Sequence, residues 1–319
     1  MEGKEFSAER KDRIKIFRSL LEWIILISLL IIILKALLSF SEYKPYDSKN
    51  VSDTTDTGFI AVSYFGVDRN GDDTLISAER LNEHLKSLKD NGYVTITQQD
   101  ILDYYEKGKK LPEKSLFLIF EDGRTDTTIF SQKIIEEYNY KSTILTYSDK
   151  FEKEDPKFLK VGDLKSLEKS TYWELGTNGY RLEYINVFDK DLNFLGRMNS
   201  LQFSEQSSNI RRDYNHYLMD YIRDEDNVPV ESYEEMKDRI DYDYEKSEKI
   251  YEEKLGKNPD LNILMHSNTG QFGTNNRASK INEKWIKELY KMNFNREGYS
   301  LNTKDNSIYD LTRIDPQSY

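Results

Sequence analysis

Residues 115–123 read SLFLIFEDG and decide how the rest of the sequence is interpreted. The apolar run that ends at Phe120 is typical of a strand buried on both faces of a parallel sheet. Two carboxylates and a glycine, Glu121, Asp122 and Gly123, follow it directly. Because functional side chains of α/β folds gather at the carboxyl ends of parallel strands, this turn is the first candidate for a functional site. A purely structural acidic turn before a helix is the alternative interpretation.

Apolar runs and amphipathic stretches alternate on both sides of this segment. The predicted strands are residues 58–64, 93–97, 142–147, 171–175 and 261–265. The predicted helices are residues 77–91, 98–107, 126–138, 231–255 and 281–292. This alternation favours an α/β fold with a parallel sheet. Residues 186–228 are polar, show no clean period and receive no assignment.

Residues 20–40 read LLEWIILISLLIIILKALLSF. An apolar stretch of about 20 residues is long enough to cross the hydrocarbon of a bilayer as a helix. Its two charges, Glu22 and Lys35, lie near its ends, where side chains can reach the interface. We therefore predict a membrane anchor. A signal peptide cleaved near residues 39–41 and a buried core helix are the alternatives.

The charges on the two sides of this stretch predict its orientation. The first eighteen residues hold six lysines and arginines, whereas few basic residues follow the span. By the positive-inside rule, the N-terminus is predicted to lie in the cytoplasm and the remainder outside the cell. The predicted organisation is a cytoplasmic segment (1–18), a single-pass transmembrane anchor (19–40), a linker (41–57) and an extracellular domain (58–319).

The composition excludes several classes of protein. The 319 residues contain 46 Lys and Arg against 57 Asp and Glu, which gives a net charge of −11. The first eighteen residues hold six bases and four acids, so the remainder carries −13, which argues against nucleic acid as a partner. The absence of Cys excludes disulfides, Cys-ligated zinc, iron–sulfur clusters and thiol nucleophiles. Only three histidines are present, His84, His216 and His266, which nearly excludes a histidine-rich metal site.

Residues 68–79 (DRNGDDTLISAE) nearly match a calcium-binding EF-hand loop. Asp73 stands where that loop requires glycine, and the preceding residues predict a strand instead of the entering helix. We therefore interpret the segment as a polar turn in which Ser77 caps the following helix.

Six pieces of the chain, taken in order, resemble the NodB-type polysaccharide deacetylase family. They are residues 62–67 (VSYFGV), 85–93 (LKSLKDNGY), 101–104 (ILDY), 118–123 (LIFEDG), 174–178 (ELGTN) and 263–266 (ILMH). Where this chain has LIFEDG, the family reads Thr-Phe-Asp-Asp-Gly. The resemblance implies a distorted (β/α) barrel of about seven strands that acts outside the membrane on N-acetylated glycans.

The family hydrolyses an amide bond with a general base, a divalent metal such as zinc and a general acid. The resemblance places Glu121 at the base, Asp122 at a metal ligand and His266 at the acid. The two metal-binding histidines of the family, four residues apart, fall on Asn178 and Leu182. Leucine cannot bind a metal and an amide oxygen is a poor ligand for zinc, so we expect no metal and no cofactor.

Further residues near the predicted strand ends are candidates for lining a cleft. They are Tyr64, Phe65, Gly123, Arg124 and Tyr180. The family also carries an arginine motif, for which Arg211 and Arg212 are the nearest candidates.

These observations favour a membrane-anchored, degenerate relative of the deacetylases. Such a protein would bind or guide a surface exopolysaccharide, or scaffold the proteins that synthesise it. One alternative is an active carbohydrate esterase that removes N-acetyl groups through an altered site around Glu121, Asp122 and His266. The other is an unrelated anchored interaction domain, for which a structure without a parallel barrel would be the sign.

Overall fold

The computed structural model describes residues 8–38, 42–47, 51, 57–72, 74–153, 155–296 and 300–316. The chain forms two compact units, one that ends at Glu42 and one that begins at Tyr43. The second unit holds the barrel and the candidate site.

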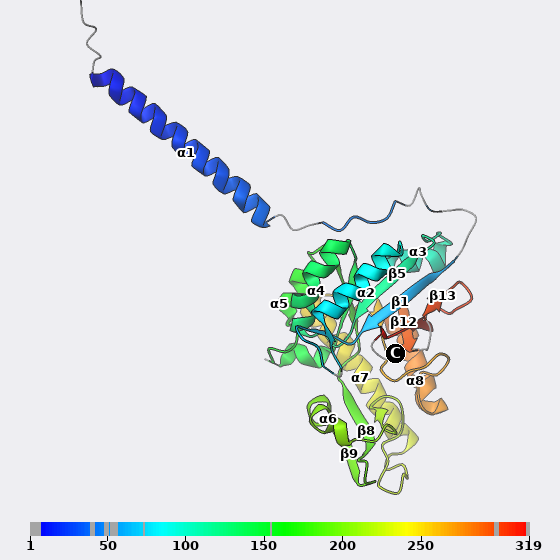
Figure 1. Ribbon diagram of the computed structural model, residues 1–319. Coiled ribbons are helices and arrows are strands. Elements are labelled where there is room, and N and C mark those ends of the chain that lie inside the picture. Colours follow the sequence, from blue (N-terminus) through cyan, green and yellow to red (C-terminus); the bar gives the residue numbers. More distant parts are fainter. Residues whose placement is uncertain are drawn as a thin grey trace, which may run out of the picture. The chain divides into compact units, whose positions relative to one another are not determined.

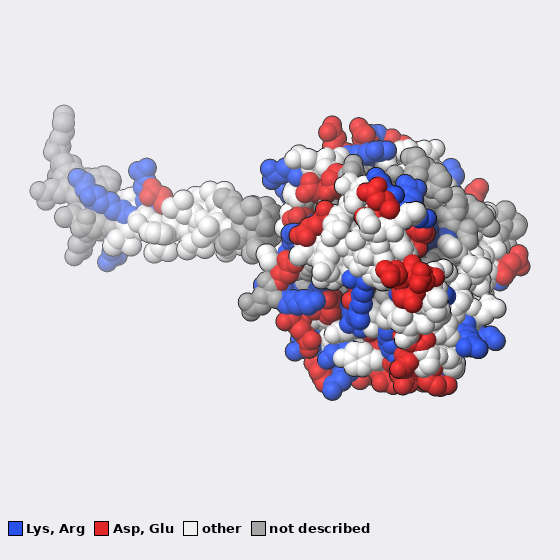
Figure 2. Space-filling view, turned by 90° about the horizontal axis from the view of Figure 1, so that it is seen from below, with Lys and Arg blue, Asp and Glu red and all other residues white. Residues whose placement is uncertain are grey.

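Helix α1 (Ala8–Leu38) belongs to the first unit and covers the predicted anchor as far as its residue 38. Residues 39 and 40 of that anchor lie outside the described residues. Figure 2 shows basic side chains near one end of this helix, followed by uncharged ones. Within the described part of the chain, we find no helix with both the length and the apolar character that a membrane crossing requires.

The compact domain begins earlier than the sequence predicts. Tyr43 donates a hydrogen bond from its hydroxyl to the carbonyl oxygen of Thr95 (2.9 Å), and Tyr46 donates one to Asp100 (2.9 Å). This part of the predicted linker therefore packs on the domain, because two tyrosines find partners that no sequence period reveals. Most of the remaining linker lies outside the described residues.

One sheet forms the centre of the domain. Its hydrogen-bonded order is β13-β1-β5-β6-β7-β11-β12-β14, and a ninth strand, β4, pairs with β5. The pairing of β13 with β1 is antiparallel, and the other pairings are parallel. The strands are β1 (Phe59–Tyr64), β4 (Val94–Thr95), β5 (Ser115–Phe120), β6 (Ser142–Thr146), β7 (Trp173–Thr177), β11 (Leu261–Asn262), β12 (Met292–Arg296), β13 (Leu301–Asn302) and β14 (Leu311–Arg313).

The sheet closes on itself where the chain runs on from β14. Val62 and Ile314 form a parallel bridge. Ser63 donates its backbone N–H to the carbonyl oxygen of Ile314 (2.9 Å), and Ile314 donates to that of Ala61 (3.1 Å). In the described part of the chain, the parallel strands β1, β5, β6, β7, β11, β12 and β14 therefore form a ring. This confirms the predicted α/β fold with a distorted barrel.

Successive side chains of β5 point to opposite sides of the sheet. Phe117 and Ile119 pack inside the barrel with residues of β1, β11 and β12. Leu116, Leu118 and Phe120 pack on the outer side, against apolar residues of the surrounding helices. Both faces of β5 are thus buried, which is what the unbroken apolar run predicts.

Helices cover the outside of the barrel (Figure 1). They are α2 (Ala78–Asp90), α3 (Gln98–Lys107), α4 (Thr125–Tyr138), α5 (Val161–Leu167), α7 (Tyr233–Leu255) and α8 (Asn276–Leu289). Helix α2 packs beside α4, and α7 packs beside α8. Side chains of Thr97 and Ser232 accept backbone N–H groups at the starts of α3 and α7, which satisfies donors that a helix leaves open.

The segment that resembles an EF-hand loop forms a polar turn between the short strands β2 (Val67–Asp68) and β3 (Ile76–Ser77). Asp72 accepts backbone N–H groups of Thr74 and Leu75. Ser77 accepts the N–H of Arg80 and caps α2, as predicted. Asp73 lies outside the described residues.

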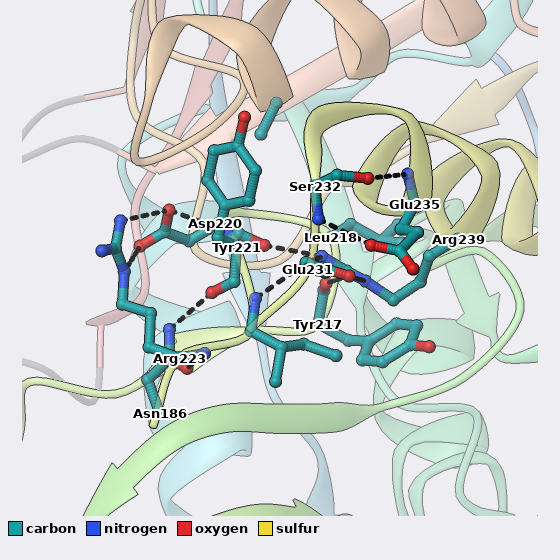
Figure 3. Close-up of polar contacts among 12 residues, drawn as sticks. Asn186, Tyr217, Leu218, Asp220, Tyr221, Arg223, Glu231, Ser232, Glu235 and Arg239 are labelled. Atoms are coloured by element: carbon teal, nitrogen blue, oxygen red, sulfur yellow. Dashed lines mark hydrogen bonds and ion pairs between the residues drawn. The ribbon is translucent and has the colours of Figure 1, made fainter. Parts of the chain in front are cut away.

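The stretch without a sequence assignment forms a small insertion away from the barrel strands (Figure 1). It contains the antiparallel strands β8 (Glu183–Phe188) and β9 (Phe194–Asn199), helix α6 (Ser200–Gln206) and β10 (Asn215–His216). Arg239 of α7 holds the loop between β10 and α7 in place. It donates hydrogen bonds to Glu231 (2.6 Å) and to the carbonyl oxygens of Tyr217 and Asp220 (Figure 3).

The last third of the chain departs from the predicted boundaries. Helix α8 begins at Asn276 and ends at Leu289, because Asn275 accepts two backbone N–H groups at its start. Residues 292–296, partly included in the predicted helix, form β12 instead. The sequence does not predict β13 (LN) or β14 (LTR), because neither belongs to an apolar run.

Candidate functional site

A cavity of about 720 Å³ lies at the carboxyl ends of the barrel strands. Among the described residues, the charged side chains of its lining are Arg212, Arg296, Arg313, Glu121 and Asp315. His266 lines it as well, so the two predicted catalytic positions, Glu121 and His266, face one cavity.

Strand alternation explains why four of the lining residues lie together. Ser63, Glu121, Arg296 and Arg313 each come two positions after a residue of the barrel interior. Because side chains two apart in a strand point the same way, these four continue the inward-facing series beyond the apolar core. Four strands that are distant in sequence thus deliver polar groups to one end of the barrel.

Glu121 is buried and fully engaged. Its Oε1 accepts hydrogen bonds from the Ser63 hydroxyl and from Arg313 Nε, the latter at 2.8 Å, and its Oε2 accepts one from Arg313 Nη2 at 3.3 Å. Burial alone would raise the pKa of the Glu121 carboxyl, but the charge and hydrogen bonds of Arg313, with those of Ser63, hold the pKa below its usual range. A carboxylate held in this way is a weak general base.

His266 stands just beyond β11 with a left-handed backbone (φ 63°). Its Nδ1 accepts the backbone N–H of His216 at 3.1 Å. The imidazole therefore carries its proton on Nε2 when neutral. The rings of Tyr214 and Tyr184 lie 5.5 and 5.8 Å from it, centroid to centroid.

Removal of His266 from bulk water and the charge of Arg296 lower its pKa to about 4. A protonated ring would also lose the hydrogen bond at Nδ1, because both nitrogens would then be donors. His266 is therefore neutral near pH 7. A neutral imidazole is a poor acid for a leaving amine, although its Nε2–H can still donate a hydrogen bond.

The metal position of the resemblance holds no set of ligands. The side chain of Leu182 packs in an apolar cluster with Tyr184 and Val187. Asn178 donates its amide to the carbonyl oxygen of Ile263 (3.3 Å), and its Oδ1 lies 3.5 Å from the backbone nitrogen of Asp122. Asp122 is thus the sole carboxylate of this trio.

These residues do not fit a divalent metal. Zinc needs three or four nitrogen, sulfur or oxygen donors, and the trio offers one carboxylate, one committed amide and one hydrocarbon. No cluster of three or more His, Cys, Asp or Glu side chains able to hold a metal occurs among the described residues.

Asp122 occupies a constrained place beside the cavity. Its backbone is left-handed (φ 66°), and Gly123 follows with φ 59°. A Cβ on Gly123 would lie 2.6 Å from Thr146 Cγ2 and 2.9 Å from the Leu145 carbonyl oxygen, so only glycine fits there. Burial raises the pKa of the Asp122 carboxyl to about 7, although Arg124 and Lys150 act in the opposite direction.

The cleft candidates separate into two groups. Phe65 lines the cavity. Tyr64 is buried in the core, stacked on Phe120. Gly123, Arg124 and Tyr180 are not among the residues that line the cavity. The arginine candidates also divide, because Arg212 lines the cavity whereas Arg211 pairs with Asp213 (2.7 Å).

Sequence reasoning missed Ser63, Arg296, Arg313, Asp315 and the aromatic Tyr214. Ser63 could have been predicted, because it lies in a predicted strand two positions after Ala61 and so faces the same side of the sheet. Arg296 and Arg313 are the last residues of strands that the sequence does not predict, so no neighbouring sequence pattern identifies them as site residues.

Solved structures of deacetylases resemble this chain over most of its length. A de-N-acetylase from Aggregatibacter actinomycetemcomitans superposes with a TM-score of 0.60 at 20% identity, over 81% of this chain and 95% of that one. The BpsB deacetylase domain from Bordetella bronchiseptica gives 0.59 at 15%, over 82% and 97%. IcaB from Ammonifex degensii gives 0.56 at 15%, over 82% and 94%. The domain has the polysaccharide deacetylase fold.

Sequence comparison with known proteins gives shorter matches. The candidate polysaccharide deacetylase YxkH of Bacillus subtilis (strain 168) is 25% identical over 125 residues, which is 39% of this chain and 41% of that protein. The poly-beta-1,6-N-acetyl-D-glucosamine N-deacetylase of Escherichia coli (strain K12) is 35% identical over 69 residues, 21% of this chain and 10% of that protein. The chain thus matches well under half of the length of these relatives. No family model matches it.

Substitution of Asp122 by Asn tests whether this carboxylate serves as a ligand. A carboxyl whose folded pKa is raised to about 7 destabilises the fold as pH rises from about 4 to 7, and the full cost is present above 7. Asn keeps the side-chain shape and tolerates a left-handed backbone. Asp122→Asn should therefore raise the unfolding free energy by about 2 kcal/mol at pH 8 and hardly change it at pH 4.5, measured by denaturant titration.

The matched control is Asp305→Asn, on an exposed loop, which should change stability at neither pH. A loss of stability for Asp122→Asn at pH 8 would contradict the raised pKa of Asp122 and show that a cation, either Arg124, Lys150 or a bound ion, stabilises the ionised carboxylate.

The protonation of His266 can be followed directly. In an NMR titration its imidazole should titrate near pH 4, well below the usual value of about 6.5. Between these two pH values the unfolded chain binds a proton at this residue and the folded chain does not, so the protein should lose more stability than His266→Asn as pH falls from 6.5 to 4. A midpoint at or above 6.5 would contradict this assignment and restore His266 as an acid.

Proposed function

We propose that this chain is a deacetylase-like protein with little or no amide hydrolysis, which binds a surface exopolysaccharide in the cavity at the end of its barrel. The observation that carries the proposal is the packing of Leu182 at the position of a metal ligand. Leucine has no ligand atom in any rotamer, so this position cannot supply the missing donor.

Two further observations support the absence of efficient hydrolysis. Both carboxylate oxygens of Glu121 accept hydrogen bonds from Arg313, so activation of a water would compete with a buried ion pair. The low pKa of His266 leaves it unprotonated near neutral pH. Base and acid are each held in the form that is less suited to the reaction.

The resemblance to glycan-modifying proteins supports a saccharide ligand. The E. coli relative carries a name that specifies poly-beta-1,6-N-acetyl-D-glucosamine, a polymer of this class. Tyr214 and Phe65 line the cavity and offer ring faces, which commonly stack on sugars. A role in guiding the polymer, or in holding proteins of its synthesis together, is compatible with binding at this cavity.

An active carbohydrate esterase remains the second candidate. It is favoured by one observation, namely that Glu121 and His266 face the same cavity even though they lie on different strands. The third possibility from the sequence, an unrelated interaction domain, required a structure without a parallel barrel, and the barrel is present.

The test is to measure the zinc content and the acetate release of the purified full chain with N-acetylglucosamine oligomers. We expect substoichiometric zinc and no acetate release above that of buffer. The positive control is the triple variant Glu121→Asp, Asn178→His, Leu182→His, which should gain zinc.

One zinc per chain with zinc-dependent acetate release would overturn the proposal. Acetate release without zinc, lost in Glu121→Gln, would favour the second candidate instead.

The location of the domain is a further part of the proposal and rests on the sequence. Residues 19–40 would anchor the chain in the cell membrane, with the N-terminus in the cytoplasm and the domain outside. Reporter fusions after residue 47 should be active only when the reporter works outside the cytoplasm, whereas fusions after residue 7 should show the reverse. Activity of a cytoplasmic reporter after residue 47 would contradict this orientation.

A further inference from the structure

The lining of the cavity differs in charge from the protein as a whole. The chain carries −11, and Figure 2 shows acidic and basic side chains interspersed over one face of the domain. The described residues of the cavity lining include three arginines and two carboxylates. Since His266 is neutral, this lining has an excess of positive charge in an acidic protein.

The three arginines have different roles. Arg313 is buried and neutralises Glu121, with its Nε 2.8 Å from the carboxylate. Arg212 is exposed and forms no ion pair with any of the described residues, so its guanidinium is available to donate hydrogen bonds to a ligand. Arg296 lies at the end of β12, and its charge acts on His266, Glu121 and Tyr214.

Arg212 and Arg296 line the same cavity as Tyr214 and His266. Burial raises the pKa of the Tyr214 hydroxyl, and the charges of Arg212 and Arg296 act against this rise, so both arginines lie near that residue. Tyr214 and Phe65 supply apolar faces, and Asn268 supplies an amide in the same lining. The aromatic and amide groups suit a sugar ring, but a neutral sugar does not require the charged guanidinium of Arg212 beside it.

Guanidinium groups recognise oxyanions. The planar fork of arginine donates two parallel hydrogen bonds to a carboxylate or a phosphate, and it is only weakly hydrated compared with lysine. Electrostatic attraction inside a concave site is also stronger than on an open surface, because the low-dielectric walls focus the field.

We propose that the cavity selects a saccharide that carries an anionic substituent, a carboxylate or a phosphate, which Arg212 binds and the charge of Arg296 further attracts, while Tyr214 and Phe65 contact the sugar. This inference rests on the proposed function, since it names the class of glycan that the same cavity takes. Asp315 also lines the cavity, so the three arginines exceed the two carboxylates of the lining by one positive charge.

The experiment is calorimetric titration of the full chain with four probes at low and moderate salt. The probes are a tetramer of N-acetylglucosamine, a tetramer of glucosamine, a tetramer of galacturonic acid and a glycerol phosphate oligomer of similar length. We expect at least one of the two anionic probes to bind ten times more tightly than either of the others, with an affinity that falls several-fold as salt rises. The better of the two identifies carboxylate or phosphate as the recognised group.

Arg212→Gln should lower the affinity for the anionic probe at least tenfold and change the affinity for the neutral tetramer by less than twofold. The matched control is Arg80→Gln on the exposed surface of α2, which removes the same charge away from the cavity and should change neither affinity. Equal weakening by the two substitutions would overturn the proposal, because the effect would then come from net charge alone.

The remaining outcomes separate this inference from the function on which it rests. If the neutral tetramer binds as tightly as both anionic probes, the anionic selectivity is wrong and glycan binding stands. If no oligomer binds, both the selectivity and the proposed function are overturned.

Discussion

A buried ion pair between Glu121 and Arg313 joins the centre of this sequence to its C-terminal end. The two residues are 192 positions apart, yet the guanidinium lies 2.8 and 3.3 Å from the two carboxylate oxygens. An ionised group without its partner in such a place costs about 3–5 kcal/mol, so each residue requires the other. The pair spans the point where β14 leads into the closure of the barrel against β1, and the cavity has its position because this closure exists.

The same pair decides what the site can do. Here Arg313 and Ser63 together engage both oxygens of Glu121. At the two positions where the resemblance implies metal-binding histidines, Leu182 packs in an apolar cluster and Asn178 donates to the carbonyl oxygen of Ile263.

The predictability of this molecule follows the apolar character of its strands. The strand around Phe117 and Leu118 can be predicted from the sequence, because its six residues, buried on both faces of the sheet, form an apolar run that does not fit a helix pattern. Glu121 and His266 could be placed at strand ends from the sequence and from the family resemblance. The parts that could not be predicted depend on the closure of the barrel by segments far apart in the sequence. Neither β12 (MNFNR) nor β14 (LTR) forms an apolar run, so Arg296 and Arg313 resemble ordinary surface residues in the sequence.

The central claim is that the position beside Asp122 has lost its capacity to hold a metal. The most direct measurement is anomalous diffraction at the zinc edge from crystals of this protein grown with excess zinc. We expect no anomalous peak within about 3 Å of the Asp122 carboxylate. A peak at about 2 Å from that carboxylate, completed by other protein donors, would contradict it.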